Sequence, residues 1–67
     1  MSDVSLNNII IAIVVLTDEK NKVGGGGAPI FYAANKSEQE KISMLLARIT
    51  LAMVHDLENG VKLIVKH

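Results

Sequence analysis

The stretch that most constrains the fold covers residues 37–59 and contains neither proline nor glycine. It opens with Ser37 and Glu40, which have the spacing of a capping box, in which each side chain accepts a hydrogen bond from the other residue's backbone N–H. It is followed by Gly60, and the pair Asn59 and Gly60 tolerates the positive φ that a helix C-terminus requires. The sequence therefore predicts one long helix over residues 37–59.

The predicted helix has two apolar faces, although the surface helix of a small monomer needs only one. One face carries Ile42, Leu45, Leu46, Ile49, Met53 and Leu57. The opposite face carries Met44, Ala47, Leu51 and Val54, with the spacing of a helix–helix seam. We interpret the first face as the core face and the second as an interface with another chain. The alternative is that Met44, Leu51 and Val54 are separate exposed apolar residues, which are normal on soluble proteins.

An apolar run at residues 9–16, rich in β-branched side chains, predicts a strand. Its odd positions are Ile9, Ile11, Ile13 and Val15, and its even positions are Ile10, Ala12, Val14 and Leu16. Because side chains alternate along a strand, both faces of this strand are apolar and both must be covered. One helix covers one face, so we expect a second subunit on the other.

Two shorter apolar runs, residues 30–34 and 61–66, predict two more strands on either side of the helix. The predicted fold class is α+β: a single ββαβ domain over residues 1–67, with a three-stranded sheet in spatial order 2-1-3 covered by one helix. We expect the first two strands to form a hairpin around a glycine-rich loop at residues 18–29. The second and third strands are predicted to be parallel, through a right-handed crossover. Residues 1–7 are expected to be loosely ordered.

The small size of the chain favours self-association. A domain of 67 residues buries only about 60% of its unfolded surface, so small scaffolds usually need disulfides, a metal or oligomerisation. The chain has no cysteine, and its two histidines, His55 and His67, are far apart in the sequence with no third ligand nearby. We therefore expect a homo-oligomer, a dimer or larger, with no metal and no cofactor.

The charge balance excludes several kinds of partner. Seven acidic and seven basic residues give a formal net charge of zero, so no strong field draws the chain to a nucleic acid polymer or an anionic membrane. The apolar run at residues 9–16 is well short of the roughly 20 residues that span a membrane, and the N-terminus lacks the basic segment of a signal peptide. We therefore expect a cytoplasmic protein.

The most unusual motif is a run of four glycines, Gly24, Gly25, Gly26 and Gly27. Successive glycine N–H groups can form a nest for phosphate or carboxylate, and Lys22, Lys41 or Arg48 from neighbouring subunits could complete such a site. The alternative is a flexible loop that only connects two strands. The run matches neither the P-loop nor the dinucleotide-binding fingerprint, since no Lys-Ser/Thr follows it and it does not open a helix.

The sequence offers no arrangement of side chains for catalysis, and we do not expect an enzyme. His55 and Asp56 are adjacent on the predicted helix and point about 100° apart, so the carboxylate cannot orient the imidazole. Two hypotheses remain. The first is a homo-oligomeric interaction protein that acts as a regulator, inhibitor or adaptor of another macromolecule. The second is an oligomer that binds or sequesters a phosphorylated small molecule or nucleotide.

Overall fold

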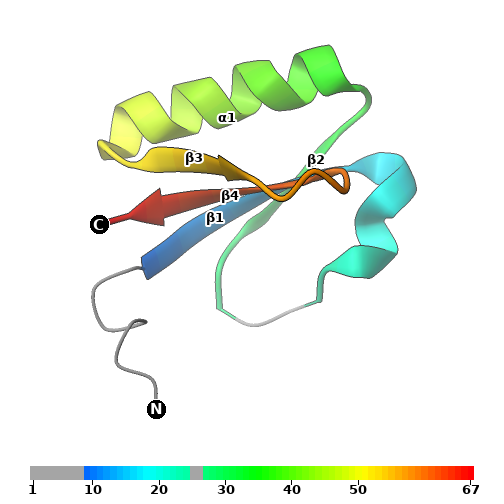
Figure 1. Cartoon of the computed structure of the whole chain (residues 1–67), viewed down its shortest axis with the longest axis horizontal. Coiled ribbons are helices and arrows are strands. Elements are labelled where there is room, and N and C mark those ends of the chain that lie inside the picture. Colours follow the sequence, from blue (N-terminus) through cyan, green and yellow to red (C-terminus); the bar gives the residue numbers. More distant parts are fainter. Residues whose placement is uncertain (1–8, 25–26) are drawn as a thin grey trace.

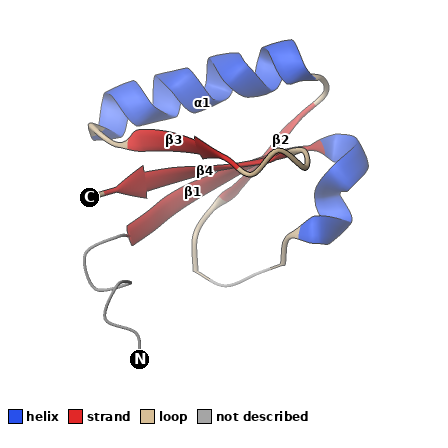
Figure 2. Ribbon diagram, in the orientation of Figure 1, coloured by secondary structure: helices blue, strands red, loops and turns tan. Residues whose placement is uncertain are grey.

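The computed structural model describes residues 9–24 and 27–67. The elements follow in the order β1 (Ile9–Leu16), the 3-10 helix η2 (Thr17–Lys22), β2 (Ile30–Ala33), α1 (Lys36–Thr50), β3 (Met53–Asp56) and β4 (Val61–Lys66). The four strands form one sheet, and α1 lies across one of its faces (Figures 1 and 2). The predicted α+β class with one long helix is confirmed, but the prediction of three strands is wrong because the sheet has four. The expectation for residues 1–7 lies outside the described residues.

The strands lie in the order β2-β1-β4-β3. The three predicted strands keep their predicted spatial order, but their directions differ. β1 and β2 pair in parallel, from Ile13 opposite Ile30 to Leu16 opposite Ala33, so residues 17–29 form a crossover and not a hairpin loop. β1 and β4 are antiparallel, so no parallel crossover leads from β2 to the last strand. The connection from β1 to β2 is long enough for a crossover, because a parallel pair needs about a dozen connecting residues, and η2 takes up about half of residues 17–29.

The helix ends at Thr50, well before the predicted residue 59. Leu51 adopts the left-handed conformation, with φ 58° and ψ 44°, and both its N–H and that of Ala52 donate to the carbonyl of Ala47. The chain then reverses, and β3 pairs antiparallel with β4. The predicted stop at Asn59 and Gly60 belongs instead to the turn between β3 and β4, where Gly60 has φ 90°. The residues of β3 also fit a helical period, but their pairing with β4 favours a strand over a longer helix.

The helix begins at Lys36, just before the predicted start. Asn35 is the N-cap, and its Oδ1 accepts a hydrogen bond of 2.8 Å from the N–H of Glu38. The Oε1 of Glu38 in turn accepts from the N–H of Ala34 at 2.7 Å. The cap thus lies two residues before the predicted Ser37 and Glu40, at an asparagine, which is among the preferred N-cap residues. It differs from the predicted capping box because Glu38 accepts from the residue before the N-cap and not from the N-cap itself.

A β-bulge at Ile11 changes which side chains of β1 share a face. Ile10 pairs with Val65 and Ala12 pairs with the next residue of β4, so Ile11 is an extra residue on β1. The expected odd-and-even alternation therefore breaks at this point. Ile11 packs with Ala12 on the α1 side, whereas Ile10 faces the same side as Ile13.

The core lies between α1 and the sheet. Its buried residues are Ala12, Val14, Ala33 and Ile64, and Ile42, Leu46 and Ala47 of the helix pack against them. Gln39 is 3% exposed, and its amide nitrogen donates to the carbonyl oxygens of Val14 and Gly60, at 3.0 Å each. These two bonds tie the first turn of α1 to β1 and to the β3–β4 turn.

The other face of the sheet is partly covered by the chain itself. Val15 and Val61 are buried, although they lie on the face that is turned away from α1. η2 and the loop after it lie on this side of the sheet (Figure 1). The expectation that a second subunit must cover the whole of this face is therefore wrong for its central part.

Candidate interaction surface

β3 is an edge strand whose four residues are all exposed. It pairs with β4 in regular register, from Met53 opposite Val65 to Asp56 opposite Lys62. Within the described part of the chain, no strand pairs with its outer side. It contains no proline, lysine or bulge, which are the features that natural edge strands use to avoid pairing. Its outer N–H and C=O groups can therefore accept a strand from another chain.

Five exposed apolar residues lie on and beside β3, and we call them the β3 flank: Met44, Leu51, Met53, Val54 and Leu57. Their exposed fractions are 54%, 83%, 58%, 37% and 48%. The side of α1 that faces β4 is marked by Glu40, whose carboxylate lies 4.0 Å from the ammonium of Lys62. Met44 follows Glu40 by one helical turn and lies on the same side. The flank thus runs from the middle of α1, over its C-terminal end, to the residue after β3.

Three of the four interface residues predicted from the sequence, Met44, Leu51 and Val54, belong to the β3 flank, and Ala47 is half-buried on the same side of α1. They do not form the expected helical seam, because Leu51 terminates the helix and Val54 lies in β3. The reversal of the chain at Leu51 brings them together.

Sequence reasoning missed Met53 and Leu57, which it assigned to the core face of a longer helix. Both side chains are exposed in the structure. The signal that could have identified them is the short run Met53–Asp56, which is compatible with a strand as well as with a helix.

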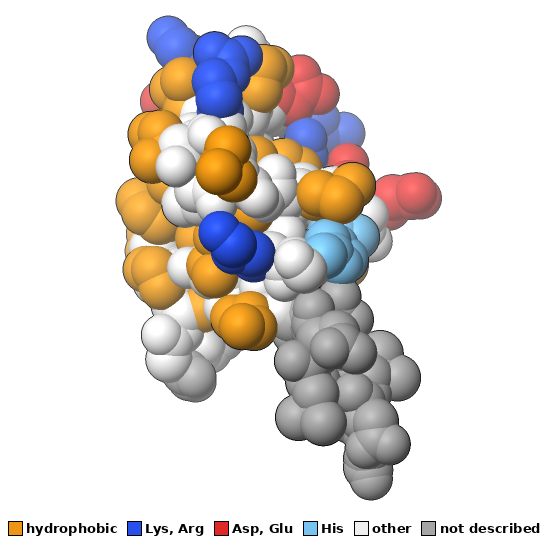
Figure 3. All heavy atoms as spheres, turned by 90° about the vertical axis from the view of Figure 1, so that its left-hand side faces the viewer, with side chains coloured by type: hydrophobic (Ala, Val, Ile, Leu, Met, Phe, Trp, Pro, Cys, Tyr) orange, Lys and Arg blue, Asp and Glu red, His pale blue; other side chains and the backbone are white. Residues whose placement is uncertain are grey.

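A second apolar cluster, the β2 flank, lies on the opposite side of α1 and consists of Phe31, Leu45 and Ile49. Their exposed fractions are 38%, 45% and 75%. Leu45 and Ile49 are one turn apart and project from the side of α1 opposite Glu40. Figure 3 shows hydrophobic side chains gathered on the side away from the histidines, and one of these histidines, His55, lies on β3.

Of the glycine run, the structure describes Gly24 and Gly27. Gly25 and Gly26 lie outside the described residues. A hollow of about 260 Å³ is lined by Ile10, Ile13, Gly24, Gly27 and Ala28. Gly27 has φ 111°, a value that requires glycine. The side chains that line this hollow are apolar.

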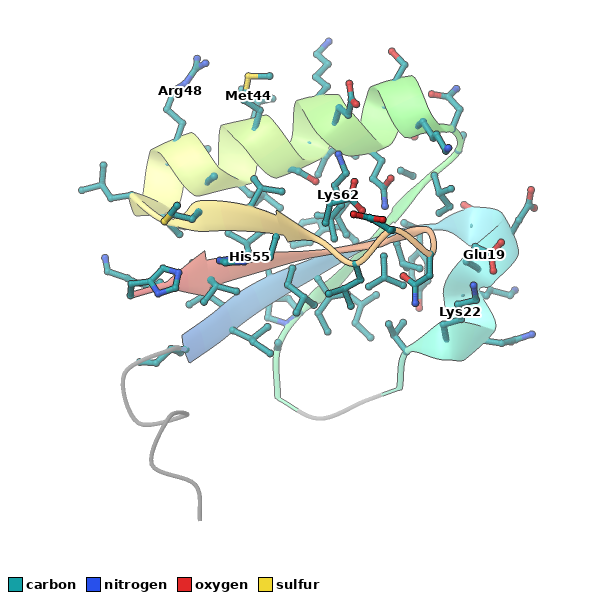
Figure 4. All side chains as sticks on the ribbon, viewed as in Figure 1. Glu19, Lys22, Met44, Arg48, His55 and Lys62 are labelled. Carbon is teal, nitrogen blue, oxygen red and sulfur yellow. The ribbon has the colours of Figure 1, made fainter. Side chains whose placement is uncertain are left out.

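The three basic residues of that hypothesis lie elsewhere. The ammonium of Lys22 forms an ion pair within η2, 3.1 Å from Glu19, and donates to a carbonyl of the β3–β4 turn. Arg48 points away from the sheet and donates to the sulfur of Met44 at 3.7 Å (Figure 4). Lys41 is exposed on the same helix. None of the three lines the hollow at Gly24 and Gly27.

A larger, polar hollow of about 530 Å³ lies where η2, the start of α1 and the β3–β4 turn meet. Its charged lining residues are Lys22, Lys36, Lys62, Glu19, Glu40, Asp56 and Glu58. Two of the lysines pair with acids of the same hollow, Lys22 with Glu19 and Lys62 with Glu40. Because the two signs of charge offset each other, the hollow has no preference for an anion.

Two further kinds of site are absent from residues 9–24 and 27–67. No three His, Asp or Glu side chains there lie close enough together to hold a metal ion. No helix in this part of the chain combines the length and the apolar character needed to cross a membrane.

A four-stranded sheet under one helix, with an open edge strand bordered by exposed apolar side chains, defines a small α+β interaction domain. Comparison with protein families matches residues 7–67 to the family described as "Capping complex subunit for YIEGIA". The chain belongs to this family, and it is a small subunit with a protein-interaction role in a complex. Comparisons with curated proteins and with solved structures found no match.

Proposed function

We propose that this protein is a non-enzymatic regulatory subunit that binds a YIEGIA protein through the β3 flank and covers part of its surface. The observation that carries the proposal is that β3, an edge strand with four exposed residues and no strand on its outer side in the described part of the chain, coincides with five exposed apolar side chains. The family description supports this choice of partner, since it names a capping complex for YIEGIA.

Strand addition gives such a complex both affinity and specificity. Backbone hydrogen bonds along β3 contribute affinity, and alternate side chains of the strand contribute specificity. Val54 lies opposite the buried Ile64 and faces the α1 side, whereas Met53 and His55 face the other side. A partner strand paired with β3 would therefore meet Val54 on one face and Met53 on the other.

The size of the chain is compatible with this mode of binding. Its accessible surface is 4629 Å². A standard interface buries about 800 Å² on each partner, which is roughly a sixth of this surface. The five apolar side chains of the β3 flank and the backbone of β3 form the centre of an interface of that size, with polar residues at its rim.

We also propose that copies of this chain associate with each other, and we assign this contact to the β2 flank. The reason is that Phe31, Leu45 and Ile49 form an apolar surface separate from the β3 flank. A domain this small buries little core of its own, and self-association would cover these side chains.

The two surfaces are tested by paired charge substitutions. Met44→Glu and Met53→Glu in the β3 flank should weaken binding to the purified YIEGIA protein, measured by calorimetry, and leave the mass of the isolated chain unchanged in light scattering. Leu45→Glu and Ile49→Glu in the β2 flank should reduce that mass and leave partner binding intact. Unchanged affinity in both β3-flank variants would place the partner elsewhere. A wild-type mass of 7.2 kDa would contradict self-association.

A further inference from the structure

Two histidine side chains meet on the surface of the sheet beside its β3 edge. The Nε2 of His55 lies 3.1 Å from the Nε2 of His67, and the ring centroids are 5.3 Å apart. His55 is in β3, opposite Leu63, and His67 directly follows β4. Since side chains alternate along a strand, residues 63, 65 and 67 project to the same face as His55. The β3–β4 hairpin therefore brings together two residues that a continuous helix would have kept apart, and Figure 3 shows the histidine side chains at the surface.

The separation of the two nitrogen atoms fits bidentate metal binding. A zinc–imidazole bond is about 2.0–2.1 Å long, so two nitrogens on one ion are about 2.9 Å apart at a right angle and about 3.3 Å apart in a tetrahedron. The observed 3.1 Å lies between these two values. In the chain without metal, this distance allows one ring N–H to donate to the other ring. An ion bound by both nitrogens would take the place of that shared proton, with both Nε2 lone pairs turned toward the ion and the donating ring protonated on Nδ1 instead.

The surroundings leave the pair accessible to an ion. Both rings are exposed. Lys66, the basic residue next to His67, projects to the α1 side, and its ammonium donates to the carbonyl of Thr50 at 3.2 Å. Asp56, next to His55, accepts a hydrogen bond from the N–H of Glu58. Neither neighbouring charged group is directed between the two rings.

We propose that His55 and His67 form a bidentate site for a divalent transition metal of the borderline class, Zn²⁺, Ni²⁺ or Cu²⁺. Imidazole nitrogen suits these ions, and the chain has no thiolate that would compete for them. Among the described residues no third His, Asp or Glu completes the site. The site does not depend on partner binding, although its open positions lie beside the edge strand.

The test uses the untagged, chelator-treated chain, because a histidine tag would bind the same ions. Titration with ZnCl₂ in a calorimeter should show one ion per chain. His55→Ala and His67→Ala should each lower the affinity at least tenfold, and the double variant should bind no more tightly than either single variant. Asp56→Asn is the matched control and should bind as the wild type does.

Copper provides an independent reading of the same site. With one equivalent of Cu²⁺ added, the electron paramagnetic resonance spectrum should show two coordinating imidazoles in the wild type and one in each single variant. Unchanged zinc affinity in either variant would overturn the proposal, as would a wild-type affinity no higher than that of the double variant. A copper spectrum with fewer than two imidazoles in the wild type would also overturn it.

Discussion

Leu51→Gly separates the stability of the isolated chain from its binding to a partner. Leu51 has φ 58° and ψ 44° at the end of α1, and its side chain is 83% exposed. A left-handed conformation costs a residue with a Cβ about 1–2 kcal/mol, a cost that glycine avoids. Because the exposed leucine contributes little packing, its removal has little cost in the isolated chain. The substitution should therefore stabilise the free protein and weaken the complex.

The two effects can be estimated separately. Glycine relieves the strain but adds backbone entropy to the unfolded chain, which costs about 0.5–1 kcal/mol. The net stabilisation is then about 0.5–1 kcal/mol, or a rise in Tm of about 2–8 °C for a domain of this size. Full burial of a leucine contributes about 1.5–3 kcal/mol. Most of the Leu51 side chain is exposed and can be buried by a partner. Removing this side chain should therefore weaken partner binding by about tenfold or more.

The assay pairs thermal unfolding with calorimetric binding to the YIEGIA protein. Glu58→Gly is the matched control, because Glu58 also has a positive φ, of 63°, but lies in the β3–β4 turn outside the β3 flank. This control should raise Tm to a similar extent and leave the affinity unchanged. If Leu51→Gly lowers Tm, the leucine packs in the isolated chain. If it leaves the affinity for the partner unchanged, the docking surface does not include Leu51.

Three further substitutions test the fold. Asn35→Ala should lower the free energy of unfolding by about 1 kcal/mol because it removes the N-cap, whereas Ser37→Ala should change Tm by less than the error. Equal effects of the two variants in differential scanning calorimetry would contradict the capping assignment. Gln39→Met keeps the side-chain volume but loses two hydrogen bonds, so urea unfolding should show a loss of about 1–3 kcal/mol; an unchanged midpoint would show that these bonds contribute nothing. Gly60→Ala should destabilise by a similar amount, because φ is 90° and the new Cβ would lie 2.6 Å from Cγ of Glu19; a neutral result would show that the turn relaxes.

The sequence predicted the parts of the fold that follow from strong local signals. The β-branched run at residues 9–16 became the central strand β1, with the run at residues 61–66 beside it as β4. The helix itself was predicted because its apolar period persists over several turns. The direction of β2 could not be read locally, since residues 17–29 are long enough for either a wide loop or a crossover.

The end of the helix was the main error, and it also determined the errors at the candidate site. Met53, Val54 and Leu57 fit the helical period, so no local signal separates a longer helix from a helix followed by a strand. Only the free edge of β4, which is known once the sheet is assembled, favours the strand. The same reversal of the chain exposes Met53 and brings His55 to His67, and neither contact can be read from a helical projection.

Two features of the β3 flank are unfavourable for an isolated domain. A helix end in the left-handed conformation is best served by glycine, yet residue 51 is a leucine that is 83% exposed. An open edge strand is best protected by lysine, proline or a bulge, yet β3 has none of them and begins with an exposed methionine. Each departure costs stability or solubility when the chain is alone. Departures from local rules are expected at functional sites, where another contact offsets them. A partner bound to the β3 flank would cover Leu51 and would also pair with β3. A single contact therefore accounts for both unfavourable features.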